Sequence, residues 1–220
     1  MNNHIVFDLD WTLADTQKIH QRIESDFLAS KWIHIDPVNI WKKYAGRSPI
    51  EWIPELLIKS RISFETKDID DFVHWKDEKV IALLNQWEIS LMPFAKETLE
   101  KLSKKWYKIW ISSGACREFI DDFIKYFVLW MIEASTSADE VENKKPAPDV
   151  FLKSFMVLEN KYWKPIKKYV VWDWRSDIIG WHKAWAISVL FNNSNIPTGE
   201  LDTMLNFEIR DLNELLDFIS

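Results

Sequence analysis

Residues 5–16 read Ile-Val-Phe-Asp-Leu-Asp-Trp-Thr-Leu-Ala-Asp-Thr, and the rest of the chain is interpreted from this stretch. Three apolar residues typical of a buried strand lead into Asp8 and Asp10, and Thr12 follows in what must be a loop. Alternate side chains of an extended chain share a face, so both carboxylates can look into one crevice. Two like charges are tolerated there only beside a cation, most simply Mg²⁺ with oxygen ligands. The stretch predicts either a catalytic acid pair or a solvated acidic turn.

The same residues resemble the first motif of the haloacid dehalogenase-like hydrolase superfamily. That motif is a hydrophobic run followed by Asp-x-Asp-Gly-Thr, and residues 7–13 fit it except at Trp11. With a metal in place, one carboxylate could attack phosphorus while the other moves a proton to and from the leaving group.

The composition describes an ordinary globular chain. Its 220 residues can hold one domain with a large insertion or two small domains, and 47% are hydrophobic and 28% charged. A net charge of -6 argues against partners such as nucleic acid or an anionic membrane surface. The single cysteine, Cys116, excludes an internal disulfide. Because residues 1–8 form no basic and apolar leader and no long apolar run follows, a cytoplasmic location is expected.

Tryptophan is unusually frequent in this chain, and glycine is unusually rare. Glycine occurs 4 times and tryptophan 14 times, whereas glycine usually makes up about 7% of a chain. Some tryptophans lie where a helix should end in left-handed glycine before a strand: Trp32, Trp106 and Trp185. Others lie in expected tight turns beside the acid pair: Trp11, Trp172 and Trp174. We hypothesise that most of these are glycines in the natural protein, read from UGA codons; the alternative is a chain rich in tryptophan for packing.

A long helical segment follows the first motif. Between residues 16 and 87 the apolar spacing is helical, and no strand candidate stands out. His20 lies one turn after Thr16 and either faces the acid pair or is structural. Arg47 either pairs with a phosphate or carboxylate through its planar fork or is a solvated surface residue.

The remaining motifs follow predicted strands. Residues 107–113 form a strand ending at Ser113, whose hydroxyl, with the backbone donor of Gly114, either binds an anion or caps the next helix. This serine matches the family's second motif. Lys145, rather than Lys144, matches the third motif, Lys-Pro-x-Pro, where a cation offsets the charge of the nucleophile and the phosphoryl group.

The fourth motif follows the predicted strand at residues 169–172. Asp173 and Asp177 match Gly-Asp-x-x-x-Asp, and glycine at position 172 would complete the fit. Residues 186–191 are expected to form the final core strand, and residues 211–219 a closing amphipathic helix.

The resemblance implies an α/β fold with a doubly wound, mainly parallel sheet and an inserted small α-helical cap. Residues 1–16 and 89–220 would form the catalytic core, and residues 17–88 the cap. It implies a Mg²⁺-dependent phosphatase acting on a small phosphorylated metabolite, such as phosphoglycolate or a sugar phosphate. The sequence indicates no particular oligomeric state.

The resemblance also assigns roles to individual residues. The catalytic groups are Asp8 as nucleophile, Asp10 as acid and base, and Ser113 and Lys145 as holders of the phosphoryl oxygens. The metal ligands are Asp8, the backbone of Asp10, and Asp173, with support from Asp177. The substrate-binding residues are Thr12, Gly114, Arg47 and His20. Two alternatives stay open, a β-phosphoglucomutase-type phosphotransferase and a non-catalytic binding protein on the same scaffold.

Overall fold

The computed structural model describes residues 3–44, 48–145, 147–174, 186–193 and 205–219. The chain divides into two compact units. The first combines Met1–Asp15 with Ser90–Ser220, and the second is Thr16–Ile89. Each is described by itself.

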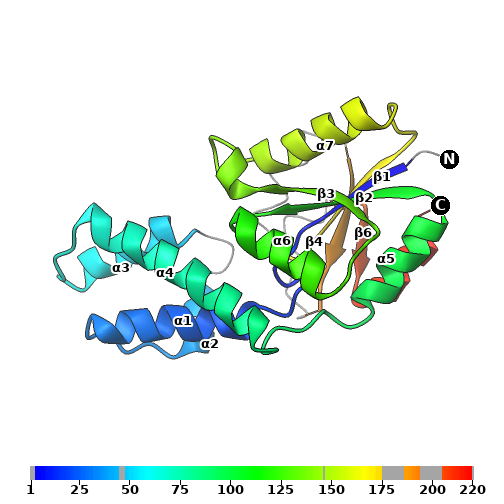
Figure 1. The fold of residues 1–220 in the computed structure, drawn as a ribbon. Helices are drawn as coiled ribbons and strands as arrows, with labels where there is room; N and C mark the ends of the chain where they lie inside the picture. Colours follow the sequence, from blue (N-terminus) through cyan, green and yellow to red (C-terminus); the bar gives the residue numbers. More distant parts are fainter. Residues whose placement is uncertain (1–2, 45–47, 146, 175–185, 194–204, 220) are drawn as a thin grey trace. The chain divides into compact units, whose positions relative to one another are not determined.

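The first unit is built on a six-stranded sheet in the order β3-β2-β1-β4-β5-β6 (Figure 1). Every neighbouring pair of strands is parallel, so the predicted α/β fold with a parallel sheet is confirmed. The strands are β1 (Asn3–Phe7), β2 (Tyr107–Ser113), β3 (Ile132–Ser137), β4 (Lys168–Trp172), β5 (Ile187–Phe191) and β6 (Phe207–Ile209). All residues of β1 are buried, because β1 lies inside the sheet and both of its faces are covered.

Helices cover both faces of the sheet. Helix α7 (Asp149–Lys161) packs Phe151, Phe155 and Leu158 against side chains from β1, β2, β4 and β5. Figure 1 shows α5 (Ala95–Lys104) on the other side of the sheet from α7. Helix α6 (Arg117–Tyr126) follows β2 and buries an apolar face that includes Phe119 and Phe123.

The carboxyl-terminal part differs from the prediction in two respects. The strand at residues 187–191 is not the last, because β6 adds an edge strand whose three residues are too short to show an alternating pattern. The expected helix over residues 211–219 is instead a short 3-10 turn, Leu212–Glu214, followed by α9 (Leu215–Phe218). Asp211 starts the tighter turn by accepting a hydrogen bond from the Asn213 amide at 2.7 Å.

The second unit is helical in the part that the structure describes. It contains α1 (Gln17–Ser30), α2 (Pro37–Tyr44), α3 (Pro49–Lys59) and α4 (Thr66–Asn85). Helices α1 and α4 are joined by stacked Phe27 and Phe72 rings, 4.0 Å between centroids, and by the half-buried ion pair of Glu24 and Lys76. The inserted helical cap expected from the fold class is therefore present as a helical unit.

Several tryptophans have the left-handed backbone that glycine favours. The described residues include four such tryptophans: Trp11 (φ 60°), Trp32 (φ 64°), Trp87 (φ 65°) and Trp106 (φ 68°). Trp32, Trp87 and Trp106 each follow the last residues of a helix, and the Trp106 amide donates to the Ser103 carbonyl at 2.9 Å. A left-handed backbone disfavours any residue that has a Cβ, and glycine adopts it without that steric cost.

The expectation of a tight turn at Trp172 was wrong. Trp172 is the last residue of β4, is fully buried, and donates from its indole Nε1 to the Ser188 hydroxyl at 3.2 Å. Trp174 lies in a bend, and Trp185 lies outside the described residues. The apolar run of β4 continues through position 172, which explains why this residue remains in the strand.

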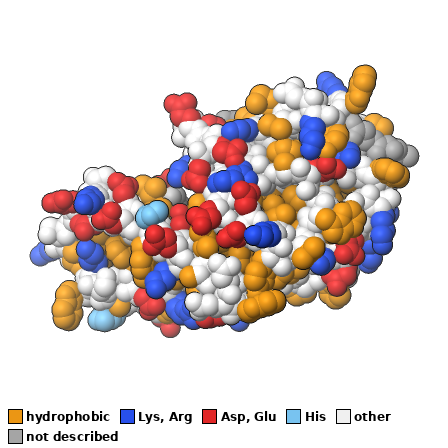
Figure 2. All heavy atoms as spheres, in the orientation of Figure 1, with side chains coloured by type: hydrophobic (Ala, Val, Ile, Leu, Met, Phe, Trp, Pro, Cys, Tyr) orange, Lys and Arg blue, Asp and Glu red, His pale blue; other side chains and the backbone are white. Residues whose placement is uncertain are grey.

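The described surface carries mixed charge. On the face shown in Figure 2, acidic and basic side chains are interspersed with apolar ones. None of the helices in the described ranges is both long and apolar enough to cross a membrane.

Candidate active site

Asp8 and Asp173 leave neighbouring strands at the same edge of the sheet. Asp8 follows β1 directly, and its amide donates to the Val171 carbonyl of β4 at 2.9 Å, so the pairing of the two strands extends to this residue. Asp173 follows the last residue of β4. Both acids are buried. The carboxyl ends of parallel strands are where open α/β sheets hold their ligands, so the two acids lie at the expected place for a site.

A tight loop after Asp8 turns the chain back toward Asp173. The carbonyl of Leu9, a buried residue, accepts hydrogen bonds from the amides of Leu13 and Ala14, both at 2.9 Å. Within this loop Thr12 is fully buried, and its hydroxyl donates to Asp173 Oδ1 at 3.2 Å. Thr12 therefore holds the acid of the fourth motif instead of pointing into solvent.

Lys145 reaches the first acid from far along the chain. Its Nζ lies 2.7 Å from Asp8 Oδ1, across 137 residues of sequence. The side chains are 15% and 8% exposed, so this ion pair is largely shielded from water. The lysine ammonium also lies over the aromatic ring of Phe151, with Nζ 4.8 Å from the ring centroid. A charge-assisted hydrogen bond this short, between two largely buried side chains, holds the lysine side chain in one place.

The loop after β2 passes beside the same lysine. A Cβ placed on Gly114 would lie 4.0 Å from Lys145 Cδ, which is ordinary contact. Ser113, the buried last residue of β2, accepts a hydrogen bond on Oγ from the Ala115 amide at 3.0 Å. Cys116, and not Ser113, occupies the N-cap position of α6, so the alternative of Ser113 as an ordinary helix cap does not describe this loop.

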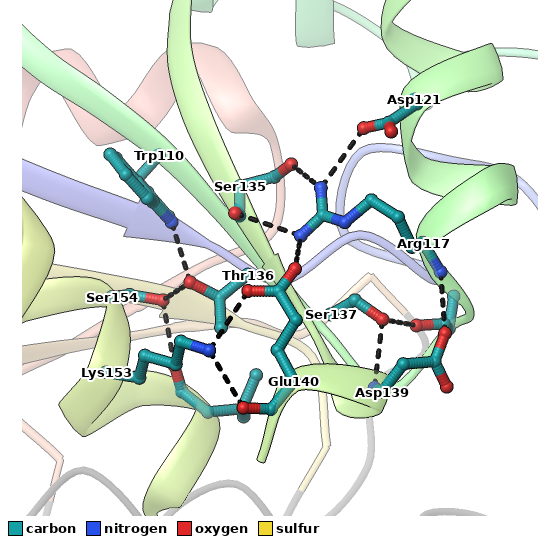
Figure 3. A network of polar contacts seen from close by, with 12 residues as sticks. Trp110, Arg117, Asp121, Ser135, Thr136, Ser137, Asp139, Glu140, Lys153 and Ser154 are labelled. Atoms are coloured by element: carbon teal, nitrogen blue, oxygen red, sulfur yellow. Dashed lines mark hydrogen bonds and ion pairs between the residues drawn. The ribbon is translucent and has the colours of Figure 1, made fainter.

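A polar network holds that loop from the side of β3 (Figure 3). The Arg117 guanidinium donates to the Ser135 hydroxyl at 2.6 Å and to Asp121 at 3.1 Å, and it also pairs with Glu140. The Ser137 hydroxyl donates to the Ala115 carbonyl at 2.9 Å. Because the bonds from Ser135, Ser137 and Glu140 come from β3 and the turn after it, the backbone after Ser113 is fixed in position.

The network also lowers the pKa of Glu140. Burial acts to raise the pKa of Glu140, but hydrogen bonds from Arg117 and Lys153 outweigh it, so the pKa is lowered from its usual value. Lys153 Nζ lies 3.2 Å from Glu140 Oε2. Glu140 is therefore ionised and acts as the acceptor at the centre of the network.

The structure places the four other predicted site residues as follows. Asp10 lies in the loop after β1, is half-buried, and forms an isolated bridge with Ala14. His20 lies on α1, within the Thr16–Ile89 unit. Arg47 and Asp177 both lie outside the described residues.

The sequence alone did not indicate Phe151 as a member of the site. It is an apolar residue in the first turns of an amphipathic helix, and such residues usually pack in the core. The one indication in the sequence that Phe151 could lie near Lys145 is its position six residues later, at the start of the following helix.

A model of the haloacid dehalogenase-like hydrolases matches residues 5–190. The chain belongs to this family. Glycerol-3-phosphatase 1 of Arabidopsis thaliana is 27% identical over 98% of this chain and 71% of its own length. The protein CbbY of Rhodobacter capsulatus is 23% identical over 70% of each chain.

Solved structures of this haloacid dehalogenase-like fold are also similar. A hydrolase from Pseudomonas syringae has a TM-score of 0.77 at 23% identity, covering 99% of both chains. CbbY from Rhodobacter sphaeroides, solved in complex with phosphate, has a TM-score of 0.75 at 18% identity, covering 98% of this chain and 96% of its own. Family membership and the phosphatases among its relatives make the chain a phosphoric monoester hydrolase.

Proposed function

We propose that this hydrolase is a Mg²⁺-dependent phosphatase of a small phosphorylated metabolite and that it works through an aspartyl-phosphate on Asp8. The observation that carries the proposal is the 2.7 Å contact between Lys145 Nζ and Asp8 Oδ1 at the carboxyl edge of the sheet. A buried carboxylate with a fixed ammonium beside it is suited to attack a phosphoryl group whose oxygens need neutralising.

The proposed reaction uses two carboxyl groups, Asp8 as the nucleophile and Asp10 first as the general acid and then as the general base. An oxygen of Asp8 attacks phosphorus, the bond from phosphorus to the leaving oxygen breaks, and Asp10 gives that oxygen its proton. Asp10, now a carboxylate, then takes a proton from water as the water oxygen attacks phosphorus. The bond between phosphorus and Asp8 breaks, which releases phosphate and restores the free carboxylate.

The surrounding groups bind the transferred phosphoryl oxygens. Lys145 supplies a positive charge beside Asp8, and the Ser113 hydroxyl and the Gly114 amide supply hydrogen-bond donors from the loop that passes next to Lys145. Thr12 acts one step away, by holding Asp173 through its hydroxyl. These groups bind and orient the phosphate without changing their covalent state.

The donor set suits Mg²⁺. Two buried carboxylates, Asp8 and Asp173, leave adjacent strand ends, and ionised carboxylates are acceptor-only groups that hard cations favour. No group of three or more His, Cys, Asp or Glu side chains is gathered for a metal within the described ranges. From the resemblance to the family, we assign the third protein ligand to the backbone carbonyl of Asp10, with Asp177 as support. When bound, the ion would neutralise charge on the phosphoryl oxygens.

The helical unit is assigned to substrate choice. We assign residues 17–88 as the cap domain and residues 1–16 with 89–220 as the core. His20 and Arg47 are its proposed substrate contacts, because a guanidinium can bind a second phosphate or a carboxylate on the metabolite.

A substrate screen tests the function. Phosphate release with Mg²⁺ is measured on p-nitrophenyl phosphate, phosphoglycolate, glycerol 3-phosphate and hexose phosphates, for the wild-type chain and for Asp8→Asn. We expect release by the wild type and a loss of about 10⁴-fold or more in the variant. Isomer formation from a hexose phosphate without phosphate release would instead establish the phosphotransferase. If the wild type turns over none of these esters, the proposal is contradicted and the alternative of a non-catalytic binding protein is favoured.

A further inference from the structure

We infer that Phe151 is a positioning residue for Lys145, whose buried ring holds the lysine ammonium in place beside Asp8 during phosphoryl transfer. This inference rests on the proposed function. It adds to the site a residue that carries no polar group.

The contact is close and largely buried. The ring centroid of Phe151 lies 4.8 Å from Lys145 Nζ, and the ring is fully buried while the lysine side chain is 15% exposed. A cation over the face of an aromatic ring is attracted by the negative face of the ring quadrupole. The attraction is about two to four times larger in a desolvated site than on an exposed surface, because less water competes for the cation.

The ring has little freedom to move. Phe151 belongs to a buried cluster with Val6 of β1, Trp110 of β2 and Trp172 of β4. Its amide donates to the Pro148 carbonyl at 3.0 Å, which fixes the first turn of α7. Val6 of β1 lies two residues before Asp8, which directly follows that strand, so the core that holds the ring also holds the nucleophile.

The loop that carries the lysine is fixed to the same helix. The Asn143 side-chain amide donates to Asp149 Oδ2 at 2.8 Å, and the Ala147 amide donates to the Lys144 carbonyl at 3.0 Å. The lysine and the ring are therefore joined by a short, hydrogen-bonded connection. The relative position of the two groups is set by α7.

The ring has a distinct role in the proposed reaction. Formation of the aspartyl-phosphate removes the negative charge of the Asp8 carboxylate, which forms an ion pair with Lys145 at 2.7 Å in this structure. The ring keeps its quadrupole throughout, so it continues to attract the ammonium when that ion pair is lost. A lysine kept in place is ready to bind the phosphoryl oxygens in both half-reactions.

The chain offers a matched control on the same helix. Phe155 lies one turn after Phe151 in the same buried cluster, and its ring faces a different cation, Lys168, at 5.2 Å. Phe155→Leu therefore removes a comparable amount of core packing without touching Lys145.

The test compares Phe151→Leu with Phe155→Leu, and it adds Phe151 replaced by 4-fluoro- and 3,4,5-trifluorophenylalanine. Fluorine withdraws charge from the ring face while nearly preserving its size. We measure kcat and KM on p-nitrophenyl phosphate with Mg²⁺, together with urea unfolding midpoints. The expected result is a loss of about tenfold in kcat for Phe151→Leu, and a graded loss with added fluorine at nearly constant midpoint. Phe155→Leu should lower the midpoint and leave kcat within about twofold.

Two outcomes would overturn the inference. One is that the fluorinated proteins keep the wild-type kcat, and the other is that both leucine variants lose the same activity. In a Lys145→Gln background fluorination should have no further effect, and a persisting effect would also count against the role. Wild-type turnover and its loss in Asp8→Asn are established first, so a failure of the proposed function is recognised separately.

Discussion

Replacing Trp106 with glycine should stabilise the protein, because this residue is held in a left-handed conformation. Its φ is 68°, and its side chain is 74% exposed, so little apolar burial would be lost. A left-handed backbone costs an L-residue about 1–2 kcal/mol. A new glycine also frees the unfolded chain, which costs about 0.4–1 kcal/mol. The net expectation is a gain of about 0.5–1 kcal/mol in the free energy of unfolding.

Trp130 provides the matched control. It is 68% exposed and is not among the residues with positive φ. Trp130→Gly gives the unfolded chain the same added freedom but relieves no backbone strain in the folded state. Its free energy of unfolding should therefore fall by about 0.4–1 kcal/mol. The difference between the two variants, about 1–2 kcal/mol, isolates the cost of the left-handed backbone.

The assay is urea unfolding followed by far-ultraviolet circular dichroism, because tryptophan fluorescence would change with the substitutions themselves. A shift of the midpoint at constant slope reports stability alone. Trp32→Gly should behave as Trp106→Gly does, since its φ is 64° at 88% exposure. The reasoning would be refuted if Trp106→Gly were no more stable than Trp130→Gly.

Three further outcomes are expected. If the recoding hypothesis holds, codons 11, 32 and 106 read UGA in the nucleotide sequence, and UGG there would contradict it. Thr12→Val removes the hydroxyl that donates to Asp173, so the Mg²⁺ concentration for half-maximal activity should rise about tenfold in a metal titration. Burial lowers the pKa of His4 to about 4, below its usual 6.5, so the unfolded state takes up a proton first as pH falls. The free energy of unfolding of the wild type should therefore fall by about 2 kcal/mol more than that of His4→Phe between pH 7 and pH 5. Urea unfolding at each pH measures this difference, and equal losses in the two proteins would contradict it.

The sequence by itself determined the local structure of this protein. Apolar runs marked β1, β2 and β4, and polar residues at their ends marked the edge of the sheet where ligands bind. The helix ends at Trp32 and Trp106 were also evident, since the left-handed residue after a helix depends on the backbone of its own few neighbours. These features follow from covalent geometry and short-range periodicity, which a single sequence contains.

Only the tertiary structure decided which distant groups meet. The contact of Lys145 with Asp8 and the bond from Thr12 to Asp173 join distant residues through the strand order of the sheet. The ring of Phe151 lies over the ammonium because of the way α7 packs on that sheet. The burial of Trp172, which turn chemistry did not predict, also comes from its neighbours in the folded core. The physical reason is that such contacts depend on the packing of many elements at once, and no local pattern of residues records that packing.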